Sequence, residues 1–286
     1  MLTILPLLNH FNLHVFSAIP QHDDSHLNLS SPMMSSYTIS EPIYWFIVNV
    51  VALLLGYLFA PVIIPVDSDK ENRNNKYRHD DADLIASTPI YPLMIYYATK
   101  HIINHNNSVH GRWSDTSSAG YTYLWLYVMR GFVSFIAIFL GDAKIKDKLL
   151  MSFHHVVTIG CHLTTIRLGR LHWFVCLAGC FETSTIFLNI MLLFRKIQYK
   201  GFINTINGVV LWISFLNFRI ILIPYVLYRF YMDVHYYPTE TVANITRYEE
   251  IAYPATTLIV FAMSCHWFII ITRGMIKVIK TRQKTV

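Results

Sequence analysis

Long apolar stretches alternate with short polar ones along most of this chain. A membrane-spanning helix needs about 20 mostly apolar residues. Stretches of about that length occupy residues 43–64, 84–103, 121–140, 149–166, 171–194, 206–231 and 251–271. Pro89, Pro92 and Lys100 make the second stretch the weakest, because Pro interrupts helical hydrogen bonding. Since backbone groups must be satisfied within hydrocarbon, the pattern predicts an all-α integral membrane protein with seven transmembrane helices.

Composition agrees with a membrane protein. The chain has 286 residues, of which 54% are hydrophobic and 14% charged, whereas a soluble domain carries roughly 25% charged residues. Its net charge of +6 would raise the question of nucleic acid in a soluble protein. Here the basic residues sort by loop, which favours contact with membrane lipids and no nucleic-acid partner.

The distribution of Lys and Arg predicts the orientation of the chain. The loops on one side hold Lys70, Arg73, Lys76, Arg78, Lys144, Lys146, Lys148, Arg195, Lys196, Lys200, Arg273, Lys277, Lys280, Arg282 and Lys284, while the other side holds Arg112, Arg167, Arg170 and Arg247. Cytosolic loops are the Lys- and Arg-rich ones, so we expect a lumenal N-terminus and a cytosolic C-terminus. The glycosylation sequons at Asn28, Asn106 and Asn244 all fall on the Lys-poor side, in agreement with that orientation.

Polar residues gather within the fourth predicted span. His155, Thr158, His162 and Thr165 recur there at helical spacing, and His154 lies beside that stripe. Ionisable side chains at the bilayer centre cost roughly 2.5 to 3.5 kcal/mol each when charged. That cost predicts a polar chamber inside the bundle, with these side chains facing protein or water.

Neighbouring spans supply partners for this histidine face. The further candidate residues are Glu182, Thr185 and Asn189 in the fifth span, Asn217 and Arg219 in the sixth, and Arg130 near the centre of the third. A lone charge at that depth needs a partner. We therefore expect Glu182 to pair with Arg219 or Arg130, or to hydrogen-bond the histidines.

Such a chamber permits acyl transfer. A neutral imidazole of His154 or His155 can act as a general base or as a nucleophile that forms an acyl-imidazole, and the Glu182 carboxylate can orient it. The alternative is structural, because polar side chains also join transmembrane helices by hydrogen bonds typically worth under ~1 kcal/mol. For His162 and Thr165 the structural interpretation is favoured.

Three segments carry a family resemblance. Residues 154–158 are similar to the His-His-x-x-Thr start of the ceramide synthase signature, but Glu182 and Thr185 replace the two Asp residues of that signature. Residues 181–189 instead resemble the Glu-x-Ser-x-x-x-x-Asn pattern of TLC-domain-containing proteins outside the ceramide synthases, and residues 215–219 look like their aromatic-then-Arg stretch. The chain thus resembles the TLC-domain family, named for the translocating-chain-associating membrane protein, the longevity-assurance ceramide synthases and the neuronal ceroid lipofuscinosis protein.

The resemblance implies a barrel of six helices around a lipid chamber, with one additional N-terminal helix. It divides the chain into a lumenal segment (1–41), a first transmembrane helix with a cytosolic loop (42–83), the TLC domain (84–280) and a cytosolic tail (281–286). Residues 1–19 fit either a poor signal peptide or a lumenal amphipathic segment. Arg282 and Lys284 fit a degenerate dibasic endoplasmic reticulum retrieval signal or a simple positive-inside tail.

Two functions follow for an endoplasmic reticulum membrane protein of this kind. The first is lipid homeostasis, through binding or sensing lipids or setting membrane lipid composition. The second is an acyl-CoA-dependent acyltransferase, ceramide synthase-like or directed at lysophospholipids, with acyl-CoA as co-substrate and no cofactor.

Two other classes are disfavoured. His10 with His14, and His101 with His105, resemble fragments of the histidine boxes of di-metal hydroxylases. The second pair is predicted about 20 Å from His154 across a ~30 Å core, whereas metal ligands lie about 2.0–2.1 Å from their ion, so we expect no metal. A seven-helix receptor shares only the number of spans.

Overall fold

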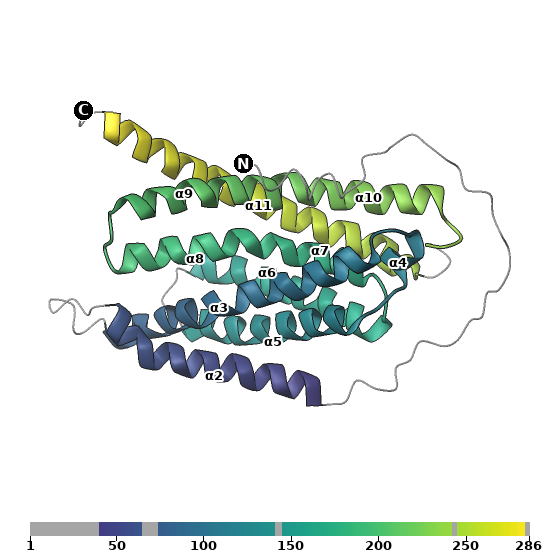
Figure 1. Ribbon diagram of the computed structural model, residues 1–286, viewed down its shortest axis with the longest axis horizontal. Helices are drawn as coiled ribbons and strands as arrows, with labels where there is room; N and C mark the ends of the chain where they lie inside the picture. The colour runs from purple at the N-terminus through teal and green to yellow at the C-terminus, as the bar shows by residue number, and fades with distance from the viewer. Residues whose placement is uncertain (1–39, 65–73, 141–144, 242–244, 284–286) are drawn as a thin grey trace. The chain divides into compact units, whose positions relative to one another are not determined.

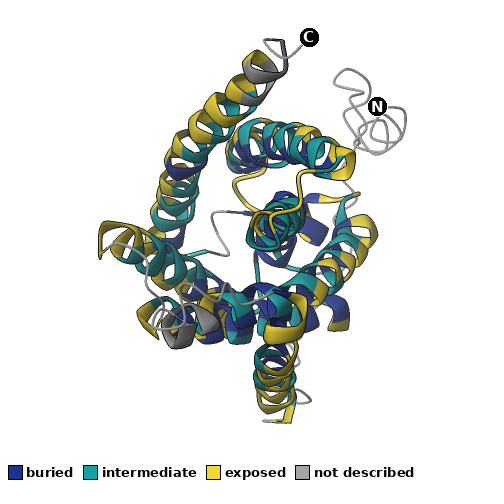
Figure 2. Ribbon diagram, turned by 90° about the vertical axis from the view of Figure 1, so that its left-hand side faces the viewer, coloured by how far each residue is buried: buried dark blue, intermediate teal, exposed yellow. Residues whose placement is uncertain are grey.

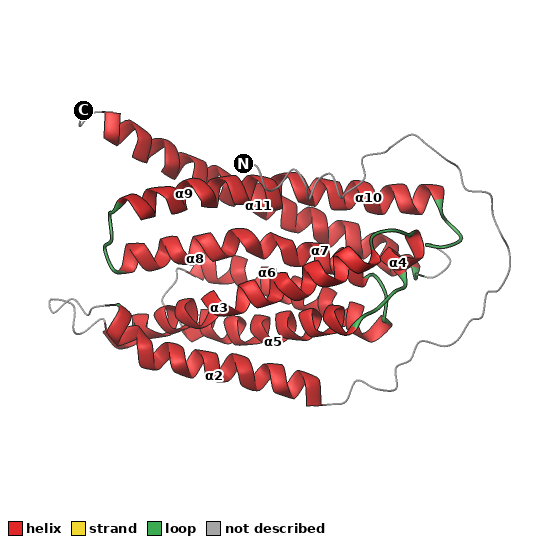
Figure 3. Ribbon diagram, viewed as in Figure 1, coloured by secondary structure: helices red, strands yellow, loops and turns green. Residues whose placement is uncertain are grey.

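The computed structural model describes residues 40–64, 74–140, 145–241 and 245–283, and within them the chain is helical with no strand (Figures 1 and 3). The elements are α2 (Ser40–Ile63), α3 (Asn74–His105), α4 (Val109–Trp113), α5 (Ser118–Leu140), α6 (Ile145–Leu168), α7 (His172–Gly179), η2 (Cys180–Glu182), α8 (Thr183–Lys196), α9 (Phe202–Phe215), η3 (Leu216–Ile221), α10 (Leu222–Tyr236) and α11 (Arg247–Gln283). The all-α prediction is confirmed, and each predicted span matches a helix or a run of joined helices, to within one residue at Ile64 and Leu171. Predictions for residues 1–39, including a leader at 1–19, and for the last residues, 284–286, lie outside the described residues.

Membrane-spanning length is met by six of these helical runs. They are Ser40–Ile63, Val109–Leu140, Ile145–Leu168, His172–Lys196, Phe202–Tyr236 and Arg247–Lys277. Within the described residues, α3 is not among them, although it has 32 residues and completes the predicted set of seven helices. It begins ten residues before the predicted start at 84 and thereby includes Asp80, Asp81 and Asp83.

Neighbouring helices shelter α3. It packs against α2, α5, α7 and α8, and its buried apolar residues recur every four positions at Ala86, Ile90, Met94, Ala98 and Ile102. That interval places them on one helix face. The other face of the helix exposes Pro89, Pro92 and Lys100. These residues and the Asp residues of its first turns account for the low hydropathy of this span.

The most enclosed helix is α7. Nearly all of it is buried, and it packs against α3, α4, α5, α6 and α10. Its Trp173 and Phe174 join Trp113 and Tyr123 among the largest fully buried side chains. Viewed along the helices, buried residues lie on the sides that face the middle of the bundle (Figure 2). On α2, by contrast, Leu58 and Val62 are exposed, as expected for a surface in contact with lipid.

Two runs depart from α-helical geometry. The 3₁₀ turn η2 separates α7 from α8, and the π-helical turn η3 separates α9 from α10. Glu182 lies in the first and Arg219 in the second. Local π-helical turns frequently occur at functional sites, and these two turns place the charged residues described next.

Candidate functional site

A cavity of about 60 Å³ lies among α5, α6, α7, α11 and the two irregular turns. It is lined by Tyr127, His154, Val157, Thr158, Cys161, His162, Val175, Ala178, Phe181, Glu182, Arg219, Tyr253, Thr256, Thr257 and Val260. One water needs roughly 10–15 Å³ on this scale, so the space holds several water-sized groups. The cavity therefore combines an apolar wall with a few polar side chains, which is typical of small-molecule sites.

Glu182 and Arg219 form the charged part of this wall. The Glu182 Oε2 atom lies 3.7 Å from an Arg219 amino group and accepts a hydrogen bond of 2.6 Å from the Thr185 hydroxyl. Arg219 also donates to Thr185 Oγ1 at 3.1 Å and to Ser184 Oγ at 2.9 Å. The expected pairing of Glu182 with Arg219 is thus confirmed, with Thr185 bridging the two charges.

The irregular turns explain how these side chains meet. A π-helical turn uses i→i+5 hydrogen bonds and so adds a residue to the turn, which rotates the following helix relative to the preceding one. In η3 this turn leaves Arg219 buried, with its guanidinium 5.3 Å from the Phe215 ring centre. The sequence carries no recognised signal for such a turn, so its position could not be predicted.

The two adjacent histidines face different surroundings. His154 lines the cavity, and its ring lies 6.0 Å from that of Trp267 on α11. His155 is not among the lining residues and instead lies in the electrostatic field of Arg130 and Asp83. Consecutive helical residues are about 100° apart around the axis, so one helix directs these two rings towards different neighbours. The two rings nevertheless remain neighbours, with their centres 5.5 Å apart, and of the two only His154 lines the cavity.

His162 is held inside the bundle. It is buried, its Nε2 atom lies 3.0 Å from the Tyr123 hydroxyl, and its Nδ1 atom lies 2.7 Å from the Thr158 carbonyl oxygen. The Tyr127 ring stacks on it at 3.8 Å between centres. Both ring nitrogens are thus engaged, which fits the structural interpretation of His162 even though it lines the cavity. Thr165, also favoured as structural, is buried further along the same helix.

Besides His155, the candidate residues Thr185, Arg130, Asn189 and Asn217 lie outside the cavity lining, and Thr185 contacts the site only through Glu182 and Arg219. Arg130 donates to Asp83 on α3 at 2.6 Å, so it is not the partner of Glu182. Asn189 donates to Ser87 Oγ at 2.8 Å, which joins α8 to α3. Asn217 donates to the carbonyl of Ile213, one turn earlier in its own helix, at 2.8 Å.

Several residues of the site were not anticipated from the sequence. Tyr127, Tyr253 and Thr256 line the cavity, but aromatic and Thr residues are common in transmembrane helices and gave no distinct signal. Asp83 had a usable signal, because it lies next to an apolar stretch and Arg130 needed a partner. The prediction placed it in a loop, whereas α3 extends through it.

The distant histidines form a group of their own. His101 stacks on His105 at 4.3 Å between ring centres and lies 5.9 Å from the ring of His172. His101 Nδ1 lies 2.7 Å from the Ser117 hydroxyl oxygen. In the part of the chain that the structure describes, no group of three or more His, Cys, Asp or Glu residues has an arrangement that could hold a metal ion. His10 and His14 lie outside that part.

Comparison with known proteins identifies the class. A family model for the TLC domain, the one named for the TRAM, LAG1 and CLN8 proteins, matches residues 84–273. Because the match covers more than half of the chain, the protein belongs to the TLC-domain family. No curated protein and no solved structure matches the chain. The membership agrees with the resemblance seen in the histidine, Glu182 and Arg219 segments.

Proposed function

We propose that this protein binds a membrane lipid in the cavity and acts in lipid homeostasis of the endoplasmic reticulum. One observation carries the proposal: the cavity is lined both by the charged pair Glu182 and Arg219 and by apolar residues such as Val157, Val175 and Val260. An amphipathic ligand satisfies both surfaces, with its polar group at the pair and its hydrocarbon against the valines.

The geometry of the charged pair supports ligand binding. At 3.7 Å the two charges are not in close hydrogen-bonding contact. Arg219 therefore retains donor capacity for an oxygen atom of a ligand, and Glu182 retains an acceptor. A hydroxyl, amide or ester group of a lipid can hydrogen-bond to either side chain.

A second candidate function is acyl transfer from acyl-CoA. The observation that favours it is the Nδ1 atom of His154, which is buried and has no hydrogen-bond partner among the described residues. As a general base, this nitrogen takes the proton of an acceptor hydroxyl or amine while that group attacks the thioester carbonyl. The carbon–sulfur bond then breaks, and the departing CoA thiolate receives the proton back as a thiol.

The test compares His154→Ala with His155→Ala, which is a matched control one residue away. Wild-type protein and both variants are purified, the lipids that co-purify are measured, and long-chain acyl-CoA is supplied with sphingoid bases or lysophospholipids. Lipid binding that weakens in His154→Ala more than in His155→Ala, with no acylated product from wild type, supports the binding function.

Acylated product from wild type that disappears in His154→Ala would establish the acyltransferase function in its place. An equal effect of both variants on bound lipid would contradict the assignment of the cavity as the lipid site, because His155 lies outside the lining.

A further inference from the structure

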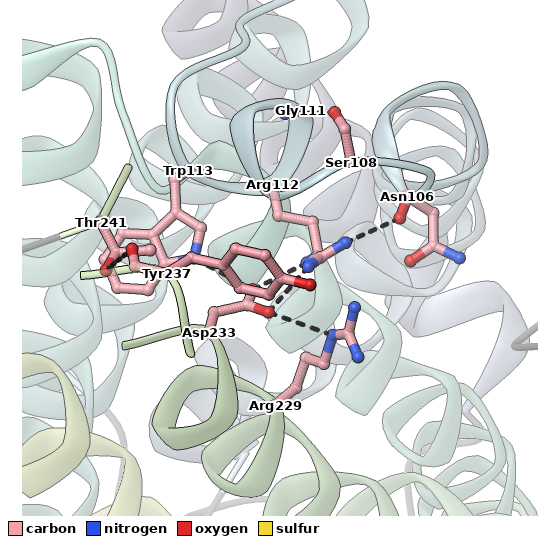
Figure 4. Close-up of polar contacts among 9 residues, drawn as sticks. All are labelled: Asn106, Ser108, Gly111, Arg112, Trp113, Arg229, Asp233, Tyr237 and Thr241. Carbon is pink, nitrogen blue, oxygen red and sulfur yellow. Dashed lines mark hydrogen bonds and ion pairs between the residues drawn. The ribbon is translucent and has the colours of Figure 1, made fainter. Parts of the chain in front are cut away.

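A second polar centre lies at the end of the bundle where α3 and α10 end and α4 begins, here called the α4 end (Figure 4). Asp233 of α10 accepts hydrogen bonds from Arg112 Nε at 2.8 Å and from the Arg112 Nη2 atom at 2.7 Å. The Trp113 indole donates a third, at 3.0 Å. The remaining Arg112 amino group donates to the Asn106 carbonyl at 2.9 Å. Arg112 and Asp233 thus satisfy each other almost completely, and each side chain is 2% exposed.

Arg229 adds a second cation to the same carboxylate. It lies one turn before Asp233 on α10, and its Nε atom is 3.6 Å from Asp233 Oδ1. That distance is longer than a hydrogen bond, and both Asp233 oxygens already accept shorter ones from Arg112. The group therefore has two guanidinium charges for one carboxylate, which leaves one positive charge uncompensated.

The uncompensated charge is accessible. The Arg229 side chain is 38% exposed, against 2% for its partner Asp233. Arg229 has no hydrogen bond to another described residue, and its guanidinium carries up to five N–H donors in a planar fork. That fork matches the oxygens of a carboxylate or phosphate group.

The surroundings place this charge at a membrane interface. Tyr228, Tyr231 and Tyr236 are exposed along the same end of α10. Tyr is enriched at the level of the lipid headgroups, where its ring is apolar and its hydroxyl reaches water. Long basic side chains at helix ends extend towards the same level. The phosphate is the anionic group that phospholipids present there.

We propose that Arg229 is the centre of a binding site for the phosphate of a phospholipid in the leaflet at the α4 end. Arg112 and Asp233 form the rigid base of this site, and the exposed tyrosines flank the glycerol and upper acyl chains. The site is separate from the cavity of Glu182 and Arg219, so it does not depend on the function proposed for that cavity.

The experiment uses the full-length protein, stripped of lipid in detergent and titrated with phosphatidylglycerol or with diacylglycerol of the same chains, with bound lipid counted by native mass spectrometry. Wild type is expected to bind phosphatidylglycerol about tenfold more tightly than diacylglycerol, because one additional charge-assisted contact of about 1.4 kcal/mol corresponds to a tenfold difference in Kd. Arg229→Gln should abolish this preference. Arg229→Lys, which keeps the charge, should retain part of it.

The matched control is Arg247→Gln at the same end. Arg247 is 79% exposed and pairs with Glu250 at 2.7 Å, so its charge is compensated and its loss should leave the preference unchanged. An equal loss in both variants would overturn the site, because it would indicate a general charge effect. A phosphatidylglycerol preference that survives in Arg229→Gln would also overturn it.

A melting experiment without phospholipid separates ligand binding from a structural role. Arg229→Gln should melt within about 2 °C of wild type, because Arg112 continues to hold Asp233; a shift of that size corresponds to under ~1 kcal/mol in a chain of this length. A markedly lower melting temperature, together with an unchanged lipid preference, would show that Arg229 serves only to support Asp233.

Discussion

Replacing Glu182 tests whether the pair at the cavity is ionic. Glu182→Ala removes the carboxylate 3.7 Å from Arg219 and leaves a guanidinium that is only 7% exposed. At an effective dielectric constant of about 20, two charges at that separation attract by about 4.5 kcal/mol. Breaking one side of a buried pair costs roughly 3–5 kcal/mol, because the other charge stays buried.

The structure indicates a destabilisation near the lower end of this range of roughly 3–5 kcal/mol. Arg219 keeps its hydrogen bonds to the Ser184 and Thr185 hydroxyls after the substitution, so the stranded charge is partly solvated. We therefore expect a loss of about 3 kcal/mol, or roughly 6–12 °C in melting temperature for a protein of this size. Glu182→Gln should lose less, since its amide oxygen still accepts from Thr185.

The assay is a thermal melt of the purified protein in one detergent, with Glu250→Ala as the control. Glu250 pairs with a partner that is 79% exposed, and such surface pairs contribute roughly 0–1 kcal/mol. Adding Arg219→Met to Glu182→Ala removes the stranded charge and should recover part of the loss. Identical melting temperatures for wild type, Glu182→Ala and Glu182→Gln would refute the buried ionic role, as would a double variant that shows the sum of the single losses.

Three further predictions use other parts of the bundle. Asp233→Asn should lower the melting temperature more than Glu182→Ala does, because Arg112 is 2% exposed and loses a carboxylate to which it donates two hydrogen bonds. A smaller decrease than that of Glu182→Ala would contradict this ranking. Asp83→Asn should destabilise by less than Asp233→Asn, since Asp83 is 25% exposed and water can reach the Arg130 pair; the same melts rank the two. Glycosylation mapping should find a glycan at Asn106 and none at a sequon engineered into residues 142–148. A glycan at the engineered sequon would contradict the predicted orientation.

The helices were predictable because their signal is local. A run of about 20 apolar residues requires a helix in hydrocarbon whatever its neighbours are, and every predicted run is helical. The ends were less predictable. The sequence placed the start of the second span at residue 84, but α3 begins at Asn74. Contacts with α2, α5 and α8, among them Arg130 with Asp83 and Lys196 with Asp81, support polar helical turns that hydropathy alone does not favour.

The site was predictable in its residues but only partly in its partners. The free-energy cost of burying a charge indicated that Glu182 and Arg219 each need a partner, and in the structure they pair with one another. The sequence could not predict that His154 lines the cavity while His155 does not, because this depends on which helices surround α6. Arg112 and Asp233 are 121 positions apart in the sequence, so no spacing rule could have predicted that they pair.

The ion pairs differ in a way that bears on function. Arg112 with Asp233 and Arg130 with Asp83 close at 2.7 and 2.6 Å, and each joins helices distant in sequence. The Arg112 and Asp233 pair uses almost all of its bonding capacity internally and holds two helices together. The Arg130 and Asp83 pair also joins two helices, through one amino group of Arg130, and it lies outside the cavity lining. Glu182 and Arg219 are further apart, at 3.7 Å, depend on a bridging hydroxyl, and adjoin the cavity. At that separation the two side chains retain hydrogen-bonding capacity, and both line the cavity. The tightly closed pairs therefore serve the bundle, and the open pair is the one suited to a ligand.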